Sequence, residues 1–324
     1  MRAWRKVLVW GAVTPFAGWA VLRVSGWEPV WPWTPLVAYT PYAAVVAGVG
    51  LLLAAAMRQR VAAVVALATT VVLASTVLPR GFDDGQQRVS ADGGTLRVLA
   101  ANLLVGSADE AALVALVARL RPDVLALQEL TPDALTRLDA AGLRAALPYA
   151  VTRPKRGAGG SAVYARHPLT AAEAIEHGGF RQVRAILRHP SGADVEVVSV
   201  HPCALRLYAR QPCWRSGLRA LPRARASAAG GRAGVGGGPL RVLAGDFNAT
   251  LDHLPVRELL ATGYRDAADV TGHGFTATWP QGGALPGVAI DHVLADERMS
   301  VRAFGVYPLR GTDHRPVFAV LALP

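Results

Sequence analysis

Three long apolar stretches open the chain, at residues 7–24, 35–56 and 61–78. Each has about the 17 to 25 residues with which a helix crosses the hydrocarbon core of a membrane. Arg23 is the one charged residue within them, near a stretch end from which a long side chain can reach the membrane surface. No ionisable residue sits mid-span in a way that suggests a transport path. The pattern predicts that residues 1–80 form a membrane anchor of three transmembrane helices rather than a channel.

The charges flanking these stretches predict an orientation. Basic residues precede the first stretch and separate the second from the third (Arg2, Arg5, Lys6, Arg58 and Arg60), whereas residues 25–34 contain none and carry three tryptophans. The positive-inside rule therefore places the N-terminus in the cytoplasm and the tryptophans in an aromatic belt at the outer interface. Three spans then leave everything after Arg80 outside the cell. A cleaved signal peptide explains one such stretch but not three, and buried helices of a soluble protein are the other alternative.

From residue 95 onward the pattern changes to short apolar runs that end in polar residues, after a polar, turn-rich linker at 81–94. Continuous apolar runs of this length are typical of strands buried on both faces. We expect strands at 96–102, 124–128, 161–166, 183–187, 195–201, 240–244, 289–294 and 317–323.

Helical patterns alternate with these runs at 108–120, 133–147 and 214–221. The mixture predicts an α/β domain over residues 95–324, with its sheets covered by helices. The glycine-rich segment after 221 lacks the Lys-Ser/Thr of a phosphate-binding loop, so we expect a flexible loop there.

The charge does not point to nucleic acid. The chain carries a net charge of +11, but residues 1–80 hold seven basic residues and one acid, Glu28, so only about +5 falls on residues 81–324. That is an ordinary surface for a domain of this size. Of the 34 basic residues only Lys6 and Lys155 are lysines, and this bias, with abundant Ala, Gly and Val, indicates a GC-rich bacterial genome. We therefore expect a multi-pass protein of a bacterial cell membrane.

The only two cysteines, Cys203 and Cys213, are compatible with an oxidising compartment outside the cell, in which they would pair. Two unrelated thiols are the alternative. A metal site is disfavoured because the CxxC spacing is absent.

Polar residues collect where the predicted strands end, at the edge where an α/β sheet presents its site. Carboxylate, amide and imidazole groups follow or precede six different runs: Asn102, Glu129, His201, Asp246, Asn248, Asp291, His292, Asp313 and His314. Any one of them could be a cap or a turn residue, but so many at separate strand ends are hard to explain in that way. Their oxygens suit Mg²⁺ or Mn²⁺ rather than zinc, and imidazoles beside such an ion form a set for phosphoester hydrolysis.

Eight ordered motifs resemble those of the endonuclease/exonuclease/phosphatase superfamily, which includes type I deoxyribonucleases, abasic-site endonucleases, neutral sphingomyelinases and inositol polyphosphate 5-phosphatases. They are ANLL (101–104), LQE (127–129), GSAVYARHP (160–168), SVHP (199–202), GDFNAT (245–250), TWP (278–280), IDHVL (290–294) and TDHRPV (312–317). The resemblance runs from about residue 95 to the end of the sequence. It implies a four-layered α/β sandwich, with two sheets face to face and helices outside.

The resemblance also implies roles at matching positions. Glu129 would be the main ligand of a Mg²⁺ ion, with Asn102 and Asp313 beside it. Asp246 and Asn248 would orient the attacking water and the phosphate. His314, polarised by Asp291, would act as base or stabilise the phosphoryl charge, and His201 would contact the phosphate or assist the leaving oxygen. Thr312 stands where a serine is commoner, a change that keeps the hydroxyl.

The remaining candidates have plainer interpretations. His292 should point to the opposite face of its strand. Trp279 is expected to pack beneath the site. The other histidines, His167, His177, His189, His253 and His273, are expected in solvated turns and loops.

We therefore expect a Mg²⁺-dependent phosphoesterase, tethered to the lipid bilayer through residues 1–80, with its catalytic domain outside the cytoplasm. Its substrate would be nucleic acid, or a phospholipid or lipid-linked phosphate, the latter favoured by the tether. No obligate protein partner is implied. A catalytically silent domain that binds lipid or a partner is the alternative, but no catalytic residue is missing.

Overall fold

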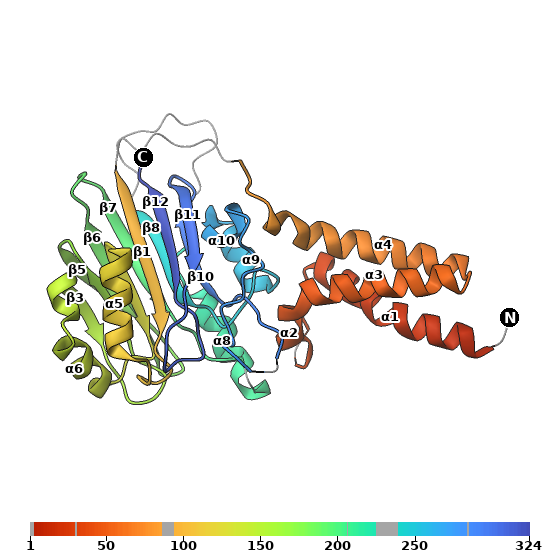
Figure 1. The fold of residues 1–324 in the computed structure, drawn as a ribbon, viewed down its shortest axis with the longest axis horizontal. Helices are drawn as coiled ribbons and strands as arrows, with labels where there is room; N and C mark the ends of the chain where they lie inside the picture. Colours follow the sequence, from red (N-terminus) through yellow and green to blue (C-terminus); the bar gives the residue numbers. More distant parts are fainter. Residues whose placement is uncertain (1–2, 30, 86–93, 206, 225–238, 284) are drawn as a thin grey trace.

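Two six-stranded mixed sheets form the body of the computed structural model, which describes residues 3–29, 31–85, 94–205, 207–224, 239–283 and 285–324 (Figure 1). The first sheet has the order β11-β12-β1-β2-β4-β3, made by Ser300–Val306, Val317–Ala322, Thr95–Asn102, Val124–Gln128, Ser161–Ala165 and Tyr149–Arg153. The second has the order β5-β6-β7-β8-β10-β9, made by Leu169–His177, Phe180–Arg188, Asp194–Val200, Leu240–Asp246, Asp291–Asp296 and Tyr264–Asp266. Each contains one parallel pair, β1 with β2 and β7 with β8.

The two sheets pack face to face, with helices on both outer faces. Valines, leucines and alanines of both sheets meet in a dry central core that includes Val98, Val163, Val197 and Val293. The outer face of the first sheet is covered by α5 (Glu110–Leu120), α6 (Pro132–Ala140) and α7 (Leu143–Ala146), and that of the second by α8 (Gln211–Arg219) and α9 (Leu254–Leu260). This is the four-layered α/β sandwich that the sequence predicts. A further short helix, α10 (Ala267–Val270), packs against β10 and β11.

All eight strands that the sequence predicts are present, within one to three residues at each end. Within the described residues, the four unpredicted ones are β3, β5, β9 and β11, and each lies at the edge of its sheet. β3, β5 and β11 are partly exposed, so their sequences lack the continuous apolar runs of the central strands, and β9 has only three residues.

The helix predicted over 133–147 is two helices. Thr131 caps α6 by accepting a hydrogen bond from the backbone of Ala134 (3.2 Å). Gly142, at φ +91°, then breaks the helix and starts α7, because a left-handed backbone is cheap only for glycine. The glycine-rich segment 225–238 lies outside the described residues.

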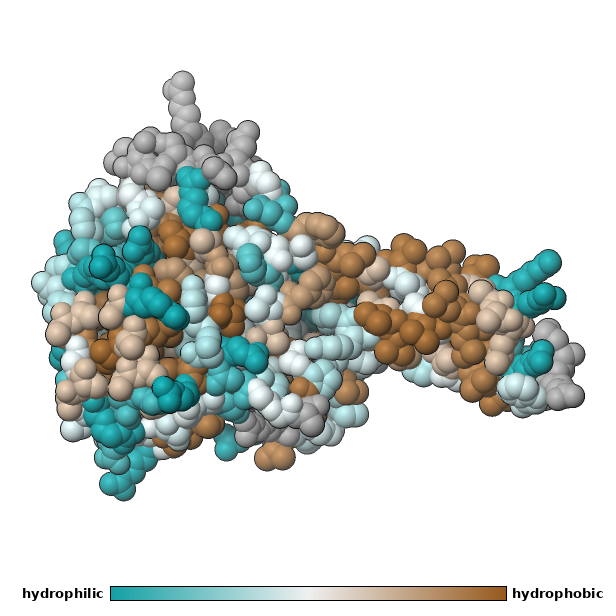
Figure 2. Space-filling model, viewed as in Figure 1, coloured by the Kyte–Doolittle hydropathy of each residue, from teal (hydrophilic) through white to brown (hydrophobic). Residues whose placement is uncertain are grey.

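The N-terminal helices are long and apolar. Three helical segments are each long and apolar enough to cross a membrane. The first is α1 (Ala3–Ser25), and the second runs from α2 (Trp33–Leu36) through a 3-10 turn (Val37–Tyr39) into α3 (Thr40–Ala56). The third is α4 (Arg60–Val77) with the turn Leu78–Gly81. Figure 2 shows apolar residues covering this rod-like part. Small residues such as Ala47, Ala54 and Ala66 face inward and large ones face out, as in helix bundles within lipid.

These helices extend from the side of the sandwich that carries α8, α9 and α10, with the N-terminus at the far end (Figure 1). The N-terminal helices and the sandwich are joined by buried polar bonds. Asp252 is fully buried and binds Arg23 (Nε–Oδ1 2.8 Å) and Arg80 (Nη2–Oδ1 2.7 Å, Nη1–Oδ2 2.8 Å). Beside it, His253 accepts from the backbone of Thr250 at Nδ1 (2.9 Å), so Nε2 carries the proton and donates to the Thr34 carbonyl (3.0 Å).

Arg23, near the end of α1, reaches the sandwich, where Asp252 neutralises its charge in a buried pair. One expectation from the sequence is wrong. His253 is not solvated: it is 1% exposed, and burial lowers its pKa to about 4. Its partner Thr34 lies 219 residues away, so no local pattern could have shown the contact.

Cys203 and Cys213 form a disulfide that ties the segment after β7 to α8 (Cα–Cα 5.8 Å). Gly178, in the β5–β6 turn, packs directly on the two sulfurs, and a Cβ there would overlap them.

Replacing Asp252 by Asn should destabilise the protein by about 3 to 5 kcal/mol, because it leaves two buried guanidinium groups without a full counter-charge. Denaturant unfolding of the full chain in detergent measures this. Asp139→Asn removes an exposed partner of Arg144 and should cost less than about 1 kcal/mol. Equal losses for the two variants would contradict the role of Asp252.

Candidate active site

The two parallel strand pairs bring the polar strand ends to one edge of the sandwich. Asn102 ends β1, Glu129 follows β2, His201 follows β7 and Asp246 ends β8. Asp291 starts β10, which runs antiparallel to β8 and places Asp291 directly opposite Asp246. Asp313 and His314 precede β12, which is antiparallel to β1. Residues spread over more than 200 positions therefore meet within hydrogen-bonding range.

Asp246 lies at the centre of this group and is 1% exposed. Its Oδ1 accepts from the backbone of Asn248 (2.7 Å), and its Oδ2 accepts from Asn102 Nδ2 (3.0 Å). The Nε2 atoms of His201 and His314 lie 3.5 and 3.7 Å from the same Oδ2. Burial raises the pKa of Asp246 above its ordinary value, because the charged form loses its hydration.

The glycine before Asp246 is required by the packing. A Cβ on Gly245 would lie 2.4 Å from the Val200 carbonyl and 2.7 Å from Nε2 of Gln128, and its φ is +145°. Gln128 Nε2 donates instead to Ser199 Oγ (2.9 Å), which donates to the Leu127 carbonyl (2.9 Å) and so links the two sheets below the site.

His314 is held by Asp291. Its Nδ1 lies 2.9 and 3.1 Å from the two carboxylate oxygens of Asp291, while Nε2 faces Asp246 and Asp313 Oδ1 (3.8 Å). Burial alone would lower the pKa of His314, but Asp291 and Asp246 outweigh it and raise the pKa to about 10. The imidazole is therefore a cation near neutral pH, with Nε2 as a donor.

His201 is the second imidazole of the site, and its pKa is shifted in the opposite direction to that of His314. It is 3% exposed, packs edge to face on Phe180, and donates its backbone N–H to Gln182 Oε1 (3.1 Å). Burial lowers the pKa of His201 below its ordinary value. Two imidazoles with pKa values shifted apart can serve one reaction as charge stabiliser and proton carrier.

Glu129 and Asp313 offer oxygens suited to a hard cation. Glu129 has a φ of +57°, a strained value for glutamate, and its Oε2 accepts from the backbone of Val105 (2.7 Å), which fixes the carboxylate in the site. Burial raises the pKa of Glu129. Asp313 binds Trp279 Nε1 through Oδ2 (2.9 Å), whereas its buried Oδ1 has no hydrogen-bond partner among the described residues. A buried acceptor without a partner is what an ion would satisfy.

Asp246, Asp291 and His314 form a second group, whose ligand atoms all lie within 4.8 Å of one another. His314 can bind a metal there only by giving up its proton, which both carboxylates stabilise. Glu129 and Asp313 need no such change, and the Asn102 side chain lies beside Glu129 (Nδ2 to Oε1, 3.3 Å).

Three supporting residues hold these groups in place. Thr312 donates to the Asn102 carbonyl (2.9 Å) and accepts from the His314 backbone (3.2 Å), so its hydroxyl joins two strand ends. Thr278 accepts from the backbone of Asp291 (3.1 Å). Trp279 does more than pack beneath the site, because its hydrogen bond to Asp313 gives it a direct positioning contact. Thr278 and Trp279 both lie in the TWP motif, and this motif was the only feature of the sequence that pointed to them.

His292 points away from the site, as the alternation of a strand predicts. Its Nδ1 bonds to Asp266 (2.8 Å) and its Nε2 to the Ala249 carbonyl (2.9 Å). His273 is exposed, while His167, His177 and His189 are partly exposed. These four are outside the site.

Comparison with known proteins matches residues 99–314 to the family described as Endonuclease/Exonuclease/phosphatase family. No curated protein sequence matches the chain.

Solved structures share the fold. An endonuclease/exonuclease/phosphatase from Beutenbergia cavernae has a TM-score of 0.53 at 19% identity, covering 71% of this chain and 72% of that one. Truncated TDP2 from Caenorhabditis elegans scores 0.52 at 17% identity, covering 71% and 98%. An AP endonuclease from Archaeoglobus fulgidus scores 0.52 at 15% identity, covering 69% and 98%. The covered share is close to the length of the sandwich without the N-terminal helices.

In EDTA-treated full chain, the His314 imidazole should stay protonated at pH 8 and lose its proton only near pH 10. Because this pKa exceeds the ordinary 6.5, the charge stabilises the fold fully below pH 6.5, and this contribution is lost as the pH rises through 10. Asp291→Asn should lower the His314 pKa by about 1 to 3 pH units. NMR titration of ¹³C-labelled histidines, assigned with His314→Gln, measures both values.

Asp194→Asn, at an exposed strand end, is the matched control and should leave the titration of His314 unchanged. A neutral His314 at pH 8 in the wild type would show that Asp291 and Asp246 do not dominate its environment.

Proposed function

The chain belongs to the endonuclease/exonuclease/phosphatase family, whose members are hydrolases acting on phosphoesters, and we propose that it is a membrane-anchored, Mg²⁺-dependent phosphoesterase. One observation carries the proposal: the carboxylates, amides and imidazoles at the strand ends converge on Asp246, with His314 held by Asp291. A domain that only binds a ligand has no need of two imidazoles around one buried carboxylate.

Glu129 and Asp313 would hold the metal, with Asn102 beside Glu129; Asn102 would join them only through Oδ1, which here accepts from the Leu104 backbone (2.9 Å). The donor set supports this, because a Glu oxygen fixed by the Val105 backbone and an Asp313 oxygen without a partner among the described residues suit Mg²⁺ or Mn²⁺. When bound, such an ion offsets negative charge on the phosphoryl oxygens.

The protein's own groups would position water and phosphate. Asp246, fixed by the Asn248 backbone, would orient the attacking water and accept its proton, and the Asn248 amide would contact the phosphate. His314 faces two carboxylates through Nε2, so it would donate to a phosphoryl oxygen rather than act as the base. His201, close to both Glu129 and Asp246, would protonate or assist the leaving oxygen.

We further propose that the three N-terminal helices span a membrane and that the sandwich lies on its outer side. The basic residues Arg58 and Arg60 lie at the α3–α4 turn, at the end of the bundle away from the sandwich, as does the N-terminus (Figure 1). The positive-inside rule favours a cytoplasmic position for that end. The disulfide between Cys203 and Cys213 is compatible with an oxidising compartment.

Hydrolysis of bis(4-nitrophenyl) phosphate by the full chain in detergent should require Mg²⁺ or Mn²⁺ and stop in EDTA. Asp246→Asn and His314→Gln should each lower kcat roughly 100-fold or more, because each removes a group acting on the transferred proton or the phosphoryl charge. Glu129→Gln should raise the Mg²⁺ concentration needed for half-maximal rate.

His273→Gln, an exposed histidine outside the site, serves as control and should retain the wild-type rate. Full metal-dependent activity in both Asp246→Asn and His314→Gln would refute this assignment. The full chain is needed, because Asp252 would lose both of its partners in a protein without residues 1–80.

Protease added outside intact cells or right-side-out vesicles should cleave the sandwich. A cysteine reagent that cannot cross membranes should label Arg58→Cys, which reports on the α3–α4 turn, only after the membrane is permeabilised. Asp194→Cys, on an exposed strand end of the sandwich, is the opposite-side control and should be labelled without permeabilisation. Labelling of Arg58→Cys in intact cells would reverse the proposed orientation.

A further inference from the structure

The anchor forms part of the wall of the candidate active site. A cavity of about 200 Å³, here called the site cavity, is lined by His314 and Asn248 on one side. Pro35, Ala38 and Tyr39, from the start of the second long helix, line the other side. The side chains that contact the phosphate in the proposed reaction therefore face a segment of the membrane anchor.

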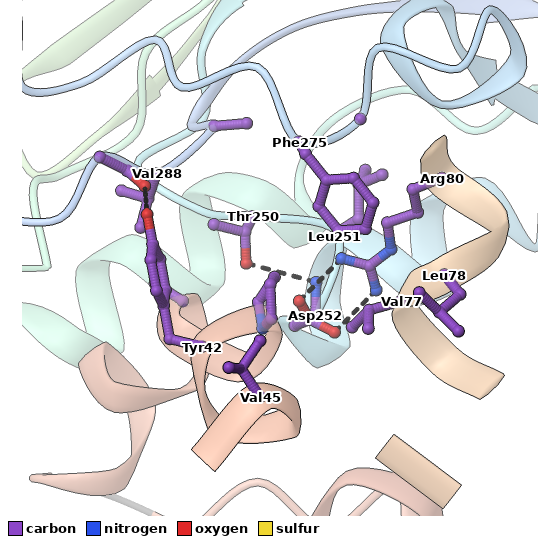
Figure 3. Close-up of a pocket in the computed structure, with 15 residues that line it drawn as sticks. Tyr42, Val45, Val77, Leu78, Arg80, Thr250, Leu251, Asp252, Phe275 and Val288 are labelled. Atoms are coloured by element: carbon purple, nitrogen blue, oxygen red, sulfur yellow. Dashed lines mark hydrogen bonds and ion pairs between the residues drawn. The ribbon is translucent and has the colours of Figure 1, made fainter. Parts of the chain in front are cut away.

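A second cavity of about 300 Å³, here called the anchor cavity, lies between the anchor and the sandwich (Figure 3). It shares Ala38 and Val288 with the site cavity, so the two adjoin at these residues. Its far end is formed by Val45 of α3 and by Val77 and Leu78 at the end of α4. The two cavities thus lie next to each other between His314 and the outer surface of the helix bundle.

The far end of the anchor cavity opens on a surface that the proposed membrane would cover. Val45 and Leu78 are 69% and 55% exposed, and Phe275 of the sandwich, which lines the same cavity (Figure 3), is 47% exposed. Exposed apolar side chains of this size at the end of a transmembrane bundle are suited to contact with lipid chains.

The lining favours an apolar occupant. Among the described residues that line the anchor cavity, only Arg80 and Asp252 are charged, and they bind each other through both carboxylate oxygens. Tyr42 is also occupied, since its hydroxyl donates to the Gly287 carbonyl (2.8 Å). The described lining of the site cavity includes no Lys or Arg, although a nucleic acid backbone is bound mainly by such residues.

The geometry points to a binding site for the hydrocarbon chain of a lipid phosphoester, formed jointly by the anchor and the sandwich. This inference rests on the proposed phosphoesterase function and names its substrate class: an amphiphile whose phosphate lies at His314 and Asn248. Its chain passes Ala38 and Val288 and continues between Val45 and Leu78 into the bilayer. The ion pairs of Asp252 and the Tyr42 hydrogen bond hold the two walls of this path in register.

The test uses the full chain in phosphatidylcholine nanodiscs with Mg²⁺ and two phosphodiesters, ethyl and hexadecyl 4-nitrophenyl phosphate. Hydrolysis adds a hydroxyl from water to phosphorus and breaks the bond to the nitrophenyl oxygen, which leaves with a proton as 4-nitrophenol. The wild type should show a kcat/KM at least ten times higher for the hexadecyl ester. Part of this preference arises because the hexadecyl ester partitions into the bilayer. The chain-binding site is therefore tested by comparing the hexadecyl-to-ethyl ratio between variants.

Ala38→Trp places a large side chain where the two cavities adjoin and should reduce the hexadecyl-to-ethyl ratio at least five-fold. Ala56→Trp, at the other end of the same helix and exposed, is the matched control and should keep the wild-type ratio. Partitioning is the same for all three proteins. An equal ratio in Ala38→Trp and Ala56→Trp would overturn the chain-binding site, as would a wild-type preference for single-stranded DNA over the hexadecyl ester.

A second measurement needs no substitution. Hexadecyl phosphate with a diazirine midway along the chain should label Val77 of the wild type, which lines the anchor cavity and is 3% exposed, as located by mass spectrometry. Labelling confined to outward positions such as Val64 and Val71 of α4 would show contact with ordinary bilayer lipid and overturn the site.

These measurements test the phosphoesterase function and the chain-binding site separately. If the ethyl ester shows no metal-dependent hydrolysis by the wild type, the phosphoesterase function is wrong and the substrate assignment falls with it. If the ethyl ester is hydrolysed but neither the ratio nor the labelling behaves as stated, only the chain-binding site is wrong.

Discussion

The candidate site depends on the direction in which four strands run. Because β1 and β2 are parallel, and β7 and β8 are parallel, four polar strand ends reach the same edge of the sandwich. The antiparallel partners β10 and β12 then begin at that edge, and the β8–β10 register sets Asp291 opposite Asp246. A register shift of one residue would turn Asp291 to the other face, where His292 now binds Asp266, and would remove the partner of His314.

A second constraint ties the chemistry to the membrane segment. Asp252 lies only six residues after Asp246, at the end of the same loop, and is neutralised by Arg23 and Arg80 of the anchor. Leaving a buried carboxylate unpaired is costly, so this loop and the anchor hold each other in place. One result is that Ala38 and Tyr39 stand opposite His314 across the site cavity. The N-terminal helices are thus a structural part of the site.

The motif residues and their surroundings carry different information. Asp246, His314 and Glu129 support phosphoester chemistry, and the same set would serve a nuclease or a lipid hydrolase. What separates these substrates is the wall around the set, here made of Ala38, Val288 and other apolar side chains. Family membership therefore supports the reaction class, while the packing of the anchor supports the substrate class.

The sequence alone determined the central strands, the three apolar helices and the candidate site residues, because continuous apolar runs and polar strand ends are local patterns. It missed the four edge strands, because β3, β5 and β11 are half-exposed and β9 has only three residues, and it misjudged His253. The burial of His253 and the ion pair of Arg23 depend on partners roughly 220 to 230 residues away, Thr34 and Asp252. The opposite pKa shifts of His314 and His201 and the two cavities that share Ala38 likewise arise only when distant segments pack together, since burial and proximity are properties of the folded chain.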